Sequence, residues 1–413
     1  MTLNRERFAL PSLAATFVVQ TTAAMAMFGV SVLAPVAAPD IGVEATLVGV
    51  FTGIAYGSGL AVGLLSGRLA DRFGALRISQ ATMVFAFFGC LLLAVSTPLS
   101  ALASAISLGL CYGPVNPLST HILSRVASER SRPLYFSIKQ TGMPAGAALA
   151  GLVLPPLVAA YNWQVAIASV GVAAAVVSVL VQPLRGPLDS IREPKLPIRL
   201  GSFIHPLLLV WETPMLRRLG LMGFTYSGVQ VAIMSFYVLY LIDDLSFSYT
   251  GDTVDLGISN LSSSLPAVGF VFAVLQISAV FGRLFWGAVA DRIIGASPLL
   301  VGIGLATATF TVLAGAMAEN WPFWSVTAVS FLVGFTSSGW NGLFFSELVR
   351  FSPAGKTGDA AAGLQFATLS GVTVVPALFG LVVTLADSYF MAFASAGLLV
   401  CVGASQFGYS LRR

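Results

Sequence analysis

The chain has 413 residues, of which 57% are hydrophobic and only 9% are charged, and its mean hydropathy is +0.89. Because a soluble domain is about a quarter charged, this composition excludes an ordinary globular enzyme and predicts an all-α protein that crosses a membrane many times. The three cysteines lie in apolar stretches without paired spacing, so we expect neither a disulfide nor a metal site.

Apolar segments long enough to cross a bilayer, which takes about 20 helical residues, recur along the whole chain. The first follows MTLNRERFAL, and its apolar run is too long for the core of a signal peptide. We therefore interpret it as a membrane helix that stays in the protein. The twelve predicted helices span 10–37, 45–67, 76–96, 98–124, 133–159, 163–183, 216–242, 264–289, 296–317, 322–346, 360–385 and 388–410.

Basic residues indicate the orientation. Of the 21 Lys and Arg residues, 19 lie before the first helix, in the loops after even-numbered helices, in the central linker or after the last helix. By the positive-inside rule both termini are cytoplasmic. The net charge of +4 therefore reflects topology and gives no sign of nucleic-acid binding. The two remaining cations, Lys139 and Arg283, lie within predicted helices.

The segment 184–215 is a long cytoplasmic linker that divides six helices from six. We therefore predict an N-terminal six-helix bundle at 1–183 and a C-terminal six-helix bundle at 216–413. On the opposite side of the membrane, the polar and acidic segment Asp243–Ser264 joins the seventh helix to the eighth. It is either a tolerated insertion or a lid that collects substrate.

A short motif occurs once in each half, 220 positions apart. Gly67–Gly74 reads GRLADRFG after the second helix, and Gly287–Gly295 reads GAVADRIIG after the eighth. Each copy places Asp-Arg before a glycine, which permits a tight turn with positive φ. The aspartate can accept backbone donors at the N-terminus of a neighbouring helix. If these were ordinary cytoplasmic loops that carry arginine, the same motif would not be expected at equivalent places in both halves.

GRLADRFG closely resembles the loop motif G-x-L-x-D-R-x-G of the major facilitator superfamily, and the second copy resembles a decayed version of it. The resemblance covers the whole chain and implies two six-helix bundles around one central cavity, with alternating access. It also implies that the motif latches the bundles in the outward-open state. The residues assigned to this gating are Gly67, Asp71, Arg72, Gly74, Gly287, Asp291 and Arg292.

Arg283 is the most informative residue, because Val271–Ala290 contains no other charge. An arginine at the centre of a membrane helix costs between about 2.5 and 17 kcal/mol. Its side chain therefore has to face a polar interior, a partner or a ligand. It precedes Asp291 by eight residues, or about 12 Å of helix, which places it near the midplane. Lys139 follows Arg132 by seven residues and lies about 10 Å deep.

The sign of the expected ligand follows from the acids, since none of the 17 Asp and Glu residues falls in the middle of a predicted helix. Two cations without an acid at their depth favour an anion, and arginine matches a carboxylate with two parallel hydrogen bonds. Two alternatives remain open. Arg283 could bond helix carbonyls or pair with Glu347 or Asp291, and Lys139 could extend to the cytoplasmic surface.

Polar residues in the middle of helices gather on the helices that the superfamily fold places around the cavity. Such residues either bind substrate or hydrogen-bond neighbouring helices. The substrate-binding candidates are Arg283, Lys139, Gln20, Tyr226, Gln230, Trp340, Asn341, Asn116 and Gln365.

A narrower resemblance concerns Arg283. The stretch GRLFWGAVADR is similar to the eighth-helix pattern G-R-x-x-x-G-x-x-x-D of monocarboxylate transporters and oxalate/formate exchangers. The stretch YFSIKQTGMPAGAALAG resembles a fifth-helix stretch of the monocarboxylate transporters, with Lys139 displaced by one position. The resemblance implies a carrier of organic anions in which Arg283 binds the substrate carboxylate.

These observations predict a secondary transporter of a small organic anion in a bacterial inner membrane. Proton symport, anion exchange and facilitated diffusion all remain open as couplings, and we favour proton symport. We expect a monomer in contact with membrane lipid, with no cofactor and no nucleic-acid partner. The main alternative is export of drugs or neutral solutes. A receptor that does not transport would be expected to carry a sizeable soluble domain. An enzyme is not supported either, because the sequence shows no nucleophile beside a base and no phosphate-binding loop.

Overall fold

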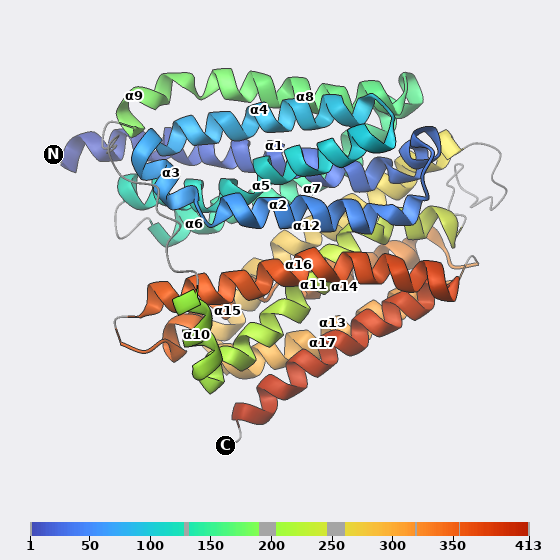
Figure 1. The fold of residues 1–413 in the computed structure, drawn as a ribbon. Coiled ribbons are helices and arrows are strands. Elements are labelled where there is room, and N and C mark those ends of the chain that lie inside the picture. Colours follow the sequence, from blue (N-terminus) through green and yellow to red (C-terminus); the bar gives the residue numbers. More distant parts are fainter. Residues whose placement is uncertain are drawn as a thin grey trace. The chain divides into compact units, whose positions relative to one another are not determined.

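The computed structural model describes residues 2–127, 132–189, 204–245, 261–318, 320–354 and 356–411. In this part of the chain all regular elements are helices (Figure 1), which confirms the predicted all-α fold. Contacts between the helices divide the chain into two units. One unit is formed by residues 1–43 and 54–200, and the other by residues 44–53 and 201–413.

The first unit contains long helices that run side by side (Figure 1). They are α1 (Thr2–Ile41), α2 (Val48–Gly63, of which 48–53 belong to the second unit), α3 (Ser66–Phe73), α4 (Ala75–Ala94), α5 (Pro98–Val126), α6 (Arg132–Gln140), α7 (Gly142–Ala160), α8 (Trp163–Leu180) and α9 (Arg185–Leu188). Helix α1 packs against α5, α7 and α8, and α4 packs against α5 and α8.

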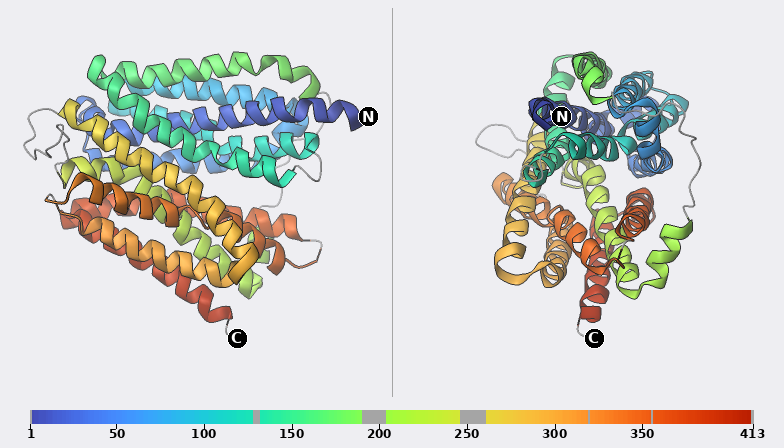
Figure 2. Two further views of the ribbon diagram at one scale, coloured as in Figure 1. Left: turned by 180° about the vertical axis from the view of Figure 1, so that it is seen from behind. Right: turned by 90° about the vertical axis from the view of Figure 1, so that its left-hand side faces the viewer.

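The second unit is a similar set of helices, seen from two further directions in Figure 2. They are α10 (Ile204–Glu212), α11 (Pro214–Asp243), α12 (Leu261–Val289), α13 (Ala296–Gly315), α14 (Phe323–Ser337), α15 (Asn341–Phe351), α16 (Thr357–Ala386) and α17 (Tyr389–Leu411). Helix α11 packs against α16 and α17, and every residue from Thr225 to Ile242 is buried. Helix α12 packs against α14, and α13 packs against α17.

Eleven segments among the described residues are long and apolar enough to cross a membrane. They correspond to eleven of the twelve predicted helices. The tenth predicted helix, at 322–346, is instead divided into α14 and α15 by a turn at 338–340. Each piece is shorter than a membrane-spanning helix. The sequence Ser-Ser-Gly at 337–339 explains the interruption, because serine and glycine favour turns over a continuous helix.

Other expected loops and helices also differ in detail. Most of the first motif copy is helical, because Gly67–Phe73 lies in α3 and only Gly74 follows it. The predicted linker at 184–215 contains α9 and α10, while its residues 190–203 lie outside the described residues. Residues 246–260 of the expected extracytoplasmic loop lie outside them too. The fifth predicted helix is interrupted at Thr141, between α6 and α7.

Small residues set how closely α12 and α14 approach each other. A Cβ atom on Gly334 would lie 1.9 Å from the carbonyl oxygen of Leu275, and one on Gly282 would lie 2.1 Å from that of Phe335. In a membrane, where water does not drive helices together, such close backbone contact is a main source of association. The pairing fixes α12 against the last turns of α14, next to the break in the tenth span.

This close contact predicts unequal effects of two glycine substitutions. Gly334→Ala forces α12 and α14 apart and should cost about 1–3 kcal/mol, as overpacking does. Gly302→Ala is the matched control, because nothing lies within 4 Å of its added methyl group on α13. Melting of the detergent-purified protein should show a lower transition temperature for Gly334→Ala only. Equal melting of the two variants would contradict the packing described.

Candidate functional site

The break in the tenth span exposes backbone carbonyls that have no partner within their own helix. The last four carbonyls of any helix are in this position, and inside a membrane they require other donors. Ser338, in the turn, accepts hydrogen bonds on its carbonyl oxygen from Arg283 Nε (3.3 Å) and from Asn341 Nδ2 (3.4 Å). The carbonyl of Phe335 accepts one from Trp286 Nε1 (3.0 Å). The break is therefore held by side chains from α12 and α15.

Arg283 reaches this turn from α12 and is half-buried. The preceding residue, Gly282, packs against the backbone of Phe335, and Gly339 in the turn packs against Trp286. Arg283 thus lies beside a close contact with the Phe335 backbone and a close contact with the Trp286 side chain. The hydrogen bond to Ser338 agrees with the alternative in which the arginine bonds a helix carbonyl.

Gln230 and Trp340 join the same group of side chains. Trp340 donates from Nε1 to Gln230 Oε1 (3.0 Å), and Gln230 donates from Nε2 to Ser338 Oγ (3.0 Å). The structure therefore brings four predicted site residues together around Ser338, a polar residue of the tenth predicted helix that was not among the predicted site residues. The four are Arg283, Gln230, Trp340 and Asn341. A signal for Ser338 existed, because it lies in the only Ser-Ser-Gly turn pattern in that span.

Tyr226 contacts this group of side chains through its aromatic ring, while its hydroxyl points to another helix. Its ring meets Trp340 edge-on, with centroids 5.8 Å apart, and its hydroxyl donates to the carbonyl of Leu300 (2.9 Å). Trp340 also meets Phe344 edge-on at 5.4 Å. The group around Ser338 therefore adjoins an aromatic wall. Gln365, the remaining candidate from this unit, is half-buried on α16.

Lys139 lies in the first unit and is fully buried on α6. Its Nζ donates to the side-chain oxygen of Asn116, to the carbonyl of Asn116 (3.3 Å) and to Thr120 Oγ1 (3.2 Å). Two predicted site residues, Lys139 and Asn116, are therefore in direct contact. Gln20 is also buried on α1, and its Oε1 has no hydrogen-bond partner among the described residues.

The first motif copy is tied to α5. Asp71 forms ion pairs with Arg125 (3.0 Å) and, at 3.6 Å, with His121 if that ring is protonated. The guanidinium of Arg72 lies over the ring of Phe73. No side chain approaches the Cβ position of Gly67 within 4 Å. The aspartate of the motif thus binds a cation of its own unit.

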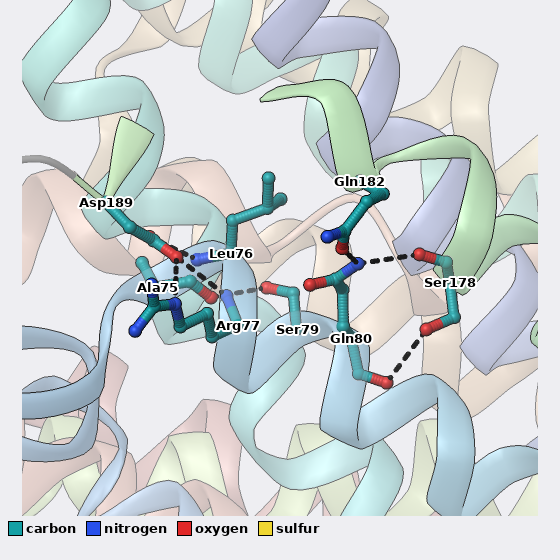
Figure 3. A network of polar contacts seen from close by, with 8 residues as sticks. All are labelled: Ala75, Leu76, Arg77, Ser79, Gln80, Ser178, Gln182 and Asp189. Atoms are coloured by element: carbon teal, nitrogen blue, oxygen red, sulfur yellow. Dashed lines mark hydrogen bonds and ion pairs between the residues drawn. The ribbon is translucent and has the colours of Figure 1, made fainter. Parts of the chain in front are cut away.

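Asp189, which sequence reasoning missed, caps the helix that follows the motif (Figure 3). Its carboxylate accepts hydrogen bonds from the backbone N–H groups of Leu76 (2.9 Å) and Arg77 (3.1 Å), at the N-terminus of α4. An added Cβ on Gly74 would lie 2.3 Å from the Asp189 carboxyl carbon. Gly74 therefore has two reasons to be glycine: a φ of 104° and the space that the carboxylate needs.

A second set of contacts lies further along α4 and joins it to the end of α8 (Figure 3). Gln80 donates from Nε2 to the carbonyl of Ser178 (2.8 Å) and to Gln182 Oε1 (2.6 Å). Burial raises the pKa of Asp189, while the Leu76 N–H and nearby cations oppose this shift. The end of the sixth span is thereby joined to the start of the third. The sequence carried only a weak signal, because Asp189 is one of three acids within a basic linker.

The second motif copy shows a related arrangement with different residues. Gly295 has a φ of 84° and precedes α13, whose Ser297 donates to the buried carboxylate of Glu347. Glu347 also pairs with Arg350 at 3.4 Å. Arg292 is exposed, and nothing within 4 Å approaches the Cβ position of Gly287. The side chain of Asp291 lies outside the described residues.

The family follows from the sequence. Residues 16–262 match the model described as Major Facilitator Superfamily. The chain belongs to this superfamily. Its family and its apolar helices make it a multi-pass membrane protein of a transporter family. Within the described part of the chain, no group of three His, Cys, Asp or Glu side chains could hold a metal ion.

Two curated proteins are similar over part of the chain. The 4-hydroxybenzoate transporter PcaK of Acinetobacter baylyi is 25% identical over 305 residues, which are 70% of this chain and 66% of PcaK. The multidrug resistance protein MdtG of Yersinia enterocolitica is 32% identical over 136 residues, which are 33% of this chain and 31% of MdtG. The chain thus spans less than two thirds of the length of either relative.

Solved structures share the fold. A bacterial homologue of the human lysosomal transporter Spinster, in an inward-facing and unoccupied conformation, has a TM-score of 0.71 at 13% identity, covering 98% of this chain and 97% of that one. The peptide transporter POT in complex with sulfate has a TM-score of 0.73 at 16% identity, covering 97% and 94%. At these identities the likeness shows the fold alone.

The contact between Gly74 and Asp189 can be tested with a double-mutant cycle. Asp189→Ala should cost about 1–2 kcal/mol of stability as the loss of a helix cap, and Gly74→Ala should cost at least as much. In the double variant the methyl group no longer meets a carboxylate, so the combined loss should be smaller than the sum by about 0.5–3 kcal/mol. Denaturant unfolding in detergent measures all four proteins. Additive losses would show that the two residues do not contact each other.

Proposed function

We propose that this protein is a secondary transporter of a small organic anion, a carboxylate, that works by alternating access in a bacterial inner membrane with both termini cytoplasmic. The observation that carries the proposal is the position of Arg283. It is a permanent cation in an otherwise uncharged helix, and it is held at the break in the tenth span with Gln230, Trp340 and Asn341 around it.

The chemistry of arginine supports a carboxylate. A guanidinium presents five N–H donors in a planar fork that fits two carboxylate oxygens at once. Retaining such a charge within a membrane is expensive, so its presence requires a compensating benefit. In our proposal the benefit is substrate affinity, with Arg283 as principal ligand and Gln230, Trp340 and Asn341 as orienting contacts. Lys139, with Asn116 and Gln20, provides a second cationic region in the first unit.

The similarity to PcaK gives the first probe. PcaK is a 4-hydroxybenzoate transporter, and 4-hydroxybenzoate combines a carboxylate with an aromatic ring. The aromatic wall of Tyr226, Trp340 and Phe344 is chemically suited to such a ring, since aromatic side chains favour edge-to-face contacts. An aromatic monocarboxylate is therefore the substrate class with which transport should be examined first.

Drug export is the second candidate function. It is favoured by the similarity to the multidrug resistance protein MdtG, which covers a third of the chain. A drug exporter would be insensitive to a conservative change at Arg283 and would not bind small carboxylates. A thermal-shift series with carboxylates and with hydrophobic cations separates the two candidates, because a ligand that binds the folded state raises its melting temperature.

The decisive experiment is 4-hydroxybenzoate counterflow in proteoliposomes. Arg283→Ala should reduce transport by more than about 30-fold, because removing one partner of a buried charge pair costs about 2–5 kcal/mol. Arg283→Lys keeps the charge but loses the fork, so its activity should lie between those of alanine and the native protein. Arg217→Lys is the matched control, since Arg217 is exposed over Trp211. Transport by both Arg283 variants at the native rate would refute the proposal.

A further inference from the structure

Lys139 has surroundings that are unusual for a charged side chain. It is fully buried, and its three contacts are with neutral oxygen atoms: the carbonyl and side-chain oxygens of Asn116 and the hydroxyl of Thr120. An ammonium group has three N–H donors. Each donor therefore has an acceptor, although none of these acceptors carries a negative charge.

The described side chains of the neighbouring helices supply no counter-ion within reach. Among the described residues, no Asp or Glu oxygen lies within 4 Å of Lys139 Nζ. On α5, the next charged groups are His121 and Arg125, and both contact Asp71. Helix α7 has no titratable residue, the described side chains of α1 include only Asp40 near its far end, and the side chain of Arg132 on α6 lies outside the described residues.

The same contacts suit a neutral lysine equally well. A buried lysine can lose its proton, whereas an arginine stays charged. The neutral amine keeps two N–H donors for the two oxygens of Asn116 and gains a lone pair. The hydroxyl of Thr120, which now donates to the carbonyl of Asn116 at 2.9 Å, can then donate to that lone pair instead. Both protonation states are therefore satisfied without moving a helix.

Thr120 also provides access to the buried amine. Thr120 is an exposed residue, whereas Lys139 is completely buried. A hydroxyl group that accepts a hydrogen bond from the lysine and faces outward is a suitable relay for one proton. The geometry thus combines a group that can change its charge, a set of contacts that tolerates both charges, and a route to the surface.

We infer that Lys139 is the proton carrier that couples anion transport to proton movement, an inference that rests on the proposed function. In each cycle the ammonium group releases one proton to water on one side of the membrane and becomes a neutral amine. It takes one proton from water on the other side and becomes an ammonium again. No other bond changes. Movement of one monocarboxylate with one proton transfers no net charge.

The test measures accumulation of 4-hydroxybenzoate in proteoliposomes, with empty liposomes correcting for passive entry. With the outside one pH unit more acidic, the native protein should accumulate the anion about tenfold, which is the gradient available at one proton per anion. Lys139→Met should continue counterflow at a reduced rate but only equalise the two concentrations. Because it moves the anion alone, its accumulation should instead respond to an imposed membrane potential that is positive inside.

Two further variants exclude a purely structural explanation. Asn116→Asp keeps the lysine in place but holds it charged beside a carboxylate, so it should also lose accumulation driven by the pH gradient. Lys356→Met is the control for loss of a lysine, since Lys356 is exposed at the start of α16, and it should accumulate like the native protein.

The outcomes separate the two proposals. Tenfold accumulation by Lys139→Met under the pH gradient would overturn the role of Lys139, as would a native protein that shows counterflow without any response to pH. Absence of carboxylate counterflow in the native protein would instead refute the proposed function itself. Loss of pH-driven accumulation in Lys139→Met and Asn116→Asp, with counterflow retained, supports the inference.

Discussion

A backbone carbonyl inside a membrane has to find a donor, and this requirement organises the second unit. Breaking the tenth span at Ser338 leaves carbonyls that a continuous helix would have satisfied. Arg283, Asn341 and Trp286 supply the donors from two other elements. The break and the cation thus support each other, since the turn gives the arginine a polar surface and the arginine stabilises the turn. Gln230 extends the same network to α11.

The first unit contains a buried charge of its own, that of Lys139. Asn116 and Thr120 surround the ammonium of Lys139 with neutral oxygens, so the charge is solvated by the protein rather than neutralised. Arginine and lysine consequently differ in what they can do here. A guanidinium keeps its charge and its planar geometry and suits a permanent anion ligand, whereas an amine can exist in two charge states. The two membrane-embedded cations therefore divide recognition and coupling between them in our proposals.

Much of the fold was predictable because a membrane span leaves a strong signal in sequence. Long apolar runs predicted the helices, and GRLADRFG indicated the superfamily to which the chain belongs. The broken tenth span was missed, since hydropathy averages over about 20 residues and does not register a three-residue turn. Its Ser-Ser-Gly pattern carried the information, but polar small residues also occur inside intact membrane helices.

The sequence drew attention to several residues of the candidate site but not to their contacts. Arg283 and Lys139 stood out because charge is rare in apolar segments. Asp189 and Ser338 did not, because an acid in a polar linker and a serine in a span are both ordinary. Their importance comes from their hydrogen bonds: Asp189 accepts from backbone N–H groups of α4, and Ser338 accepts from side chains of α11, α12 and α15. Such pairings are set by packing that a single sequence does not reveal.

The two motif loops also bear on how the halves of this chain diverged. Both loops end in a glycine with positive φ, and in both a buried acid binds the first turn of the next helix. Asp189 comes from the end of the sixth span, whereas Glu347 comes from the tenth. The two halves therefore share the turn before the next helix, but the acid that binds this helix comes from a different span in each half. Aligning one half on the other would superimpose the glycines and leave the two acids unmatched.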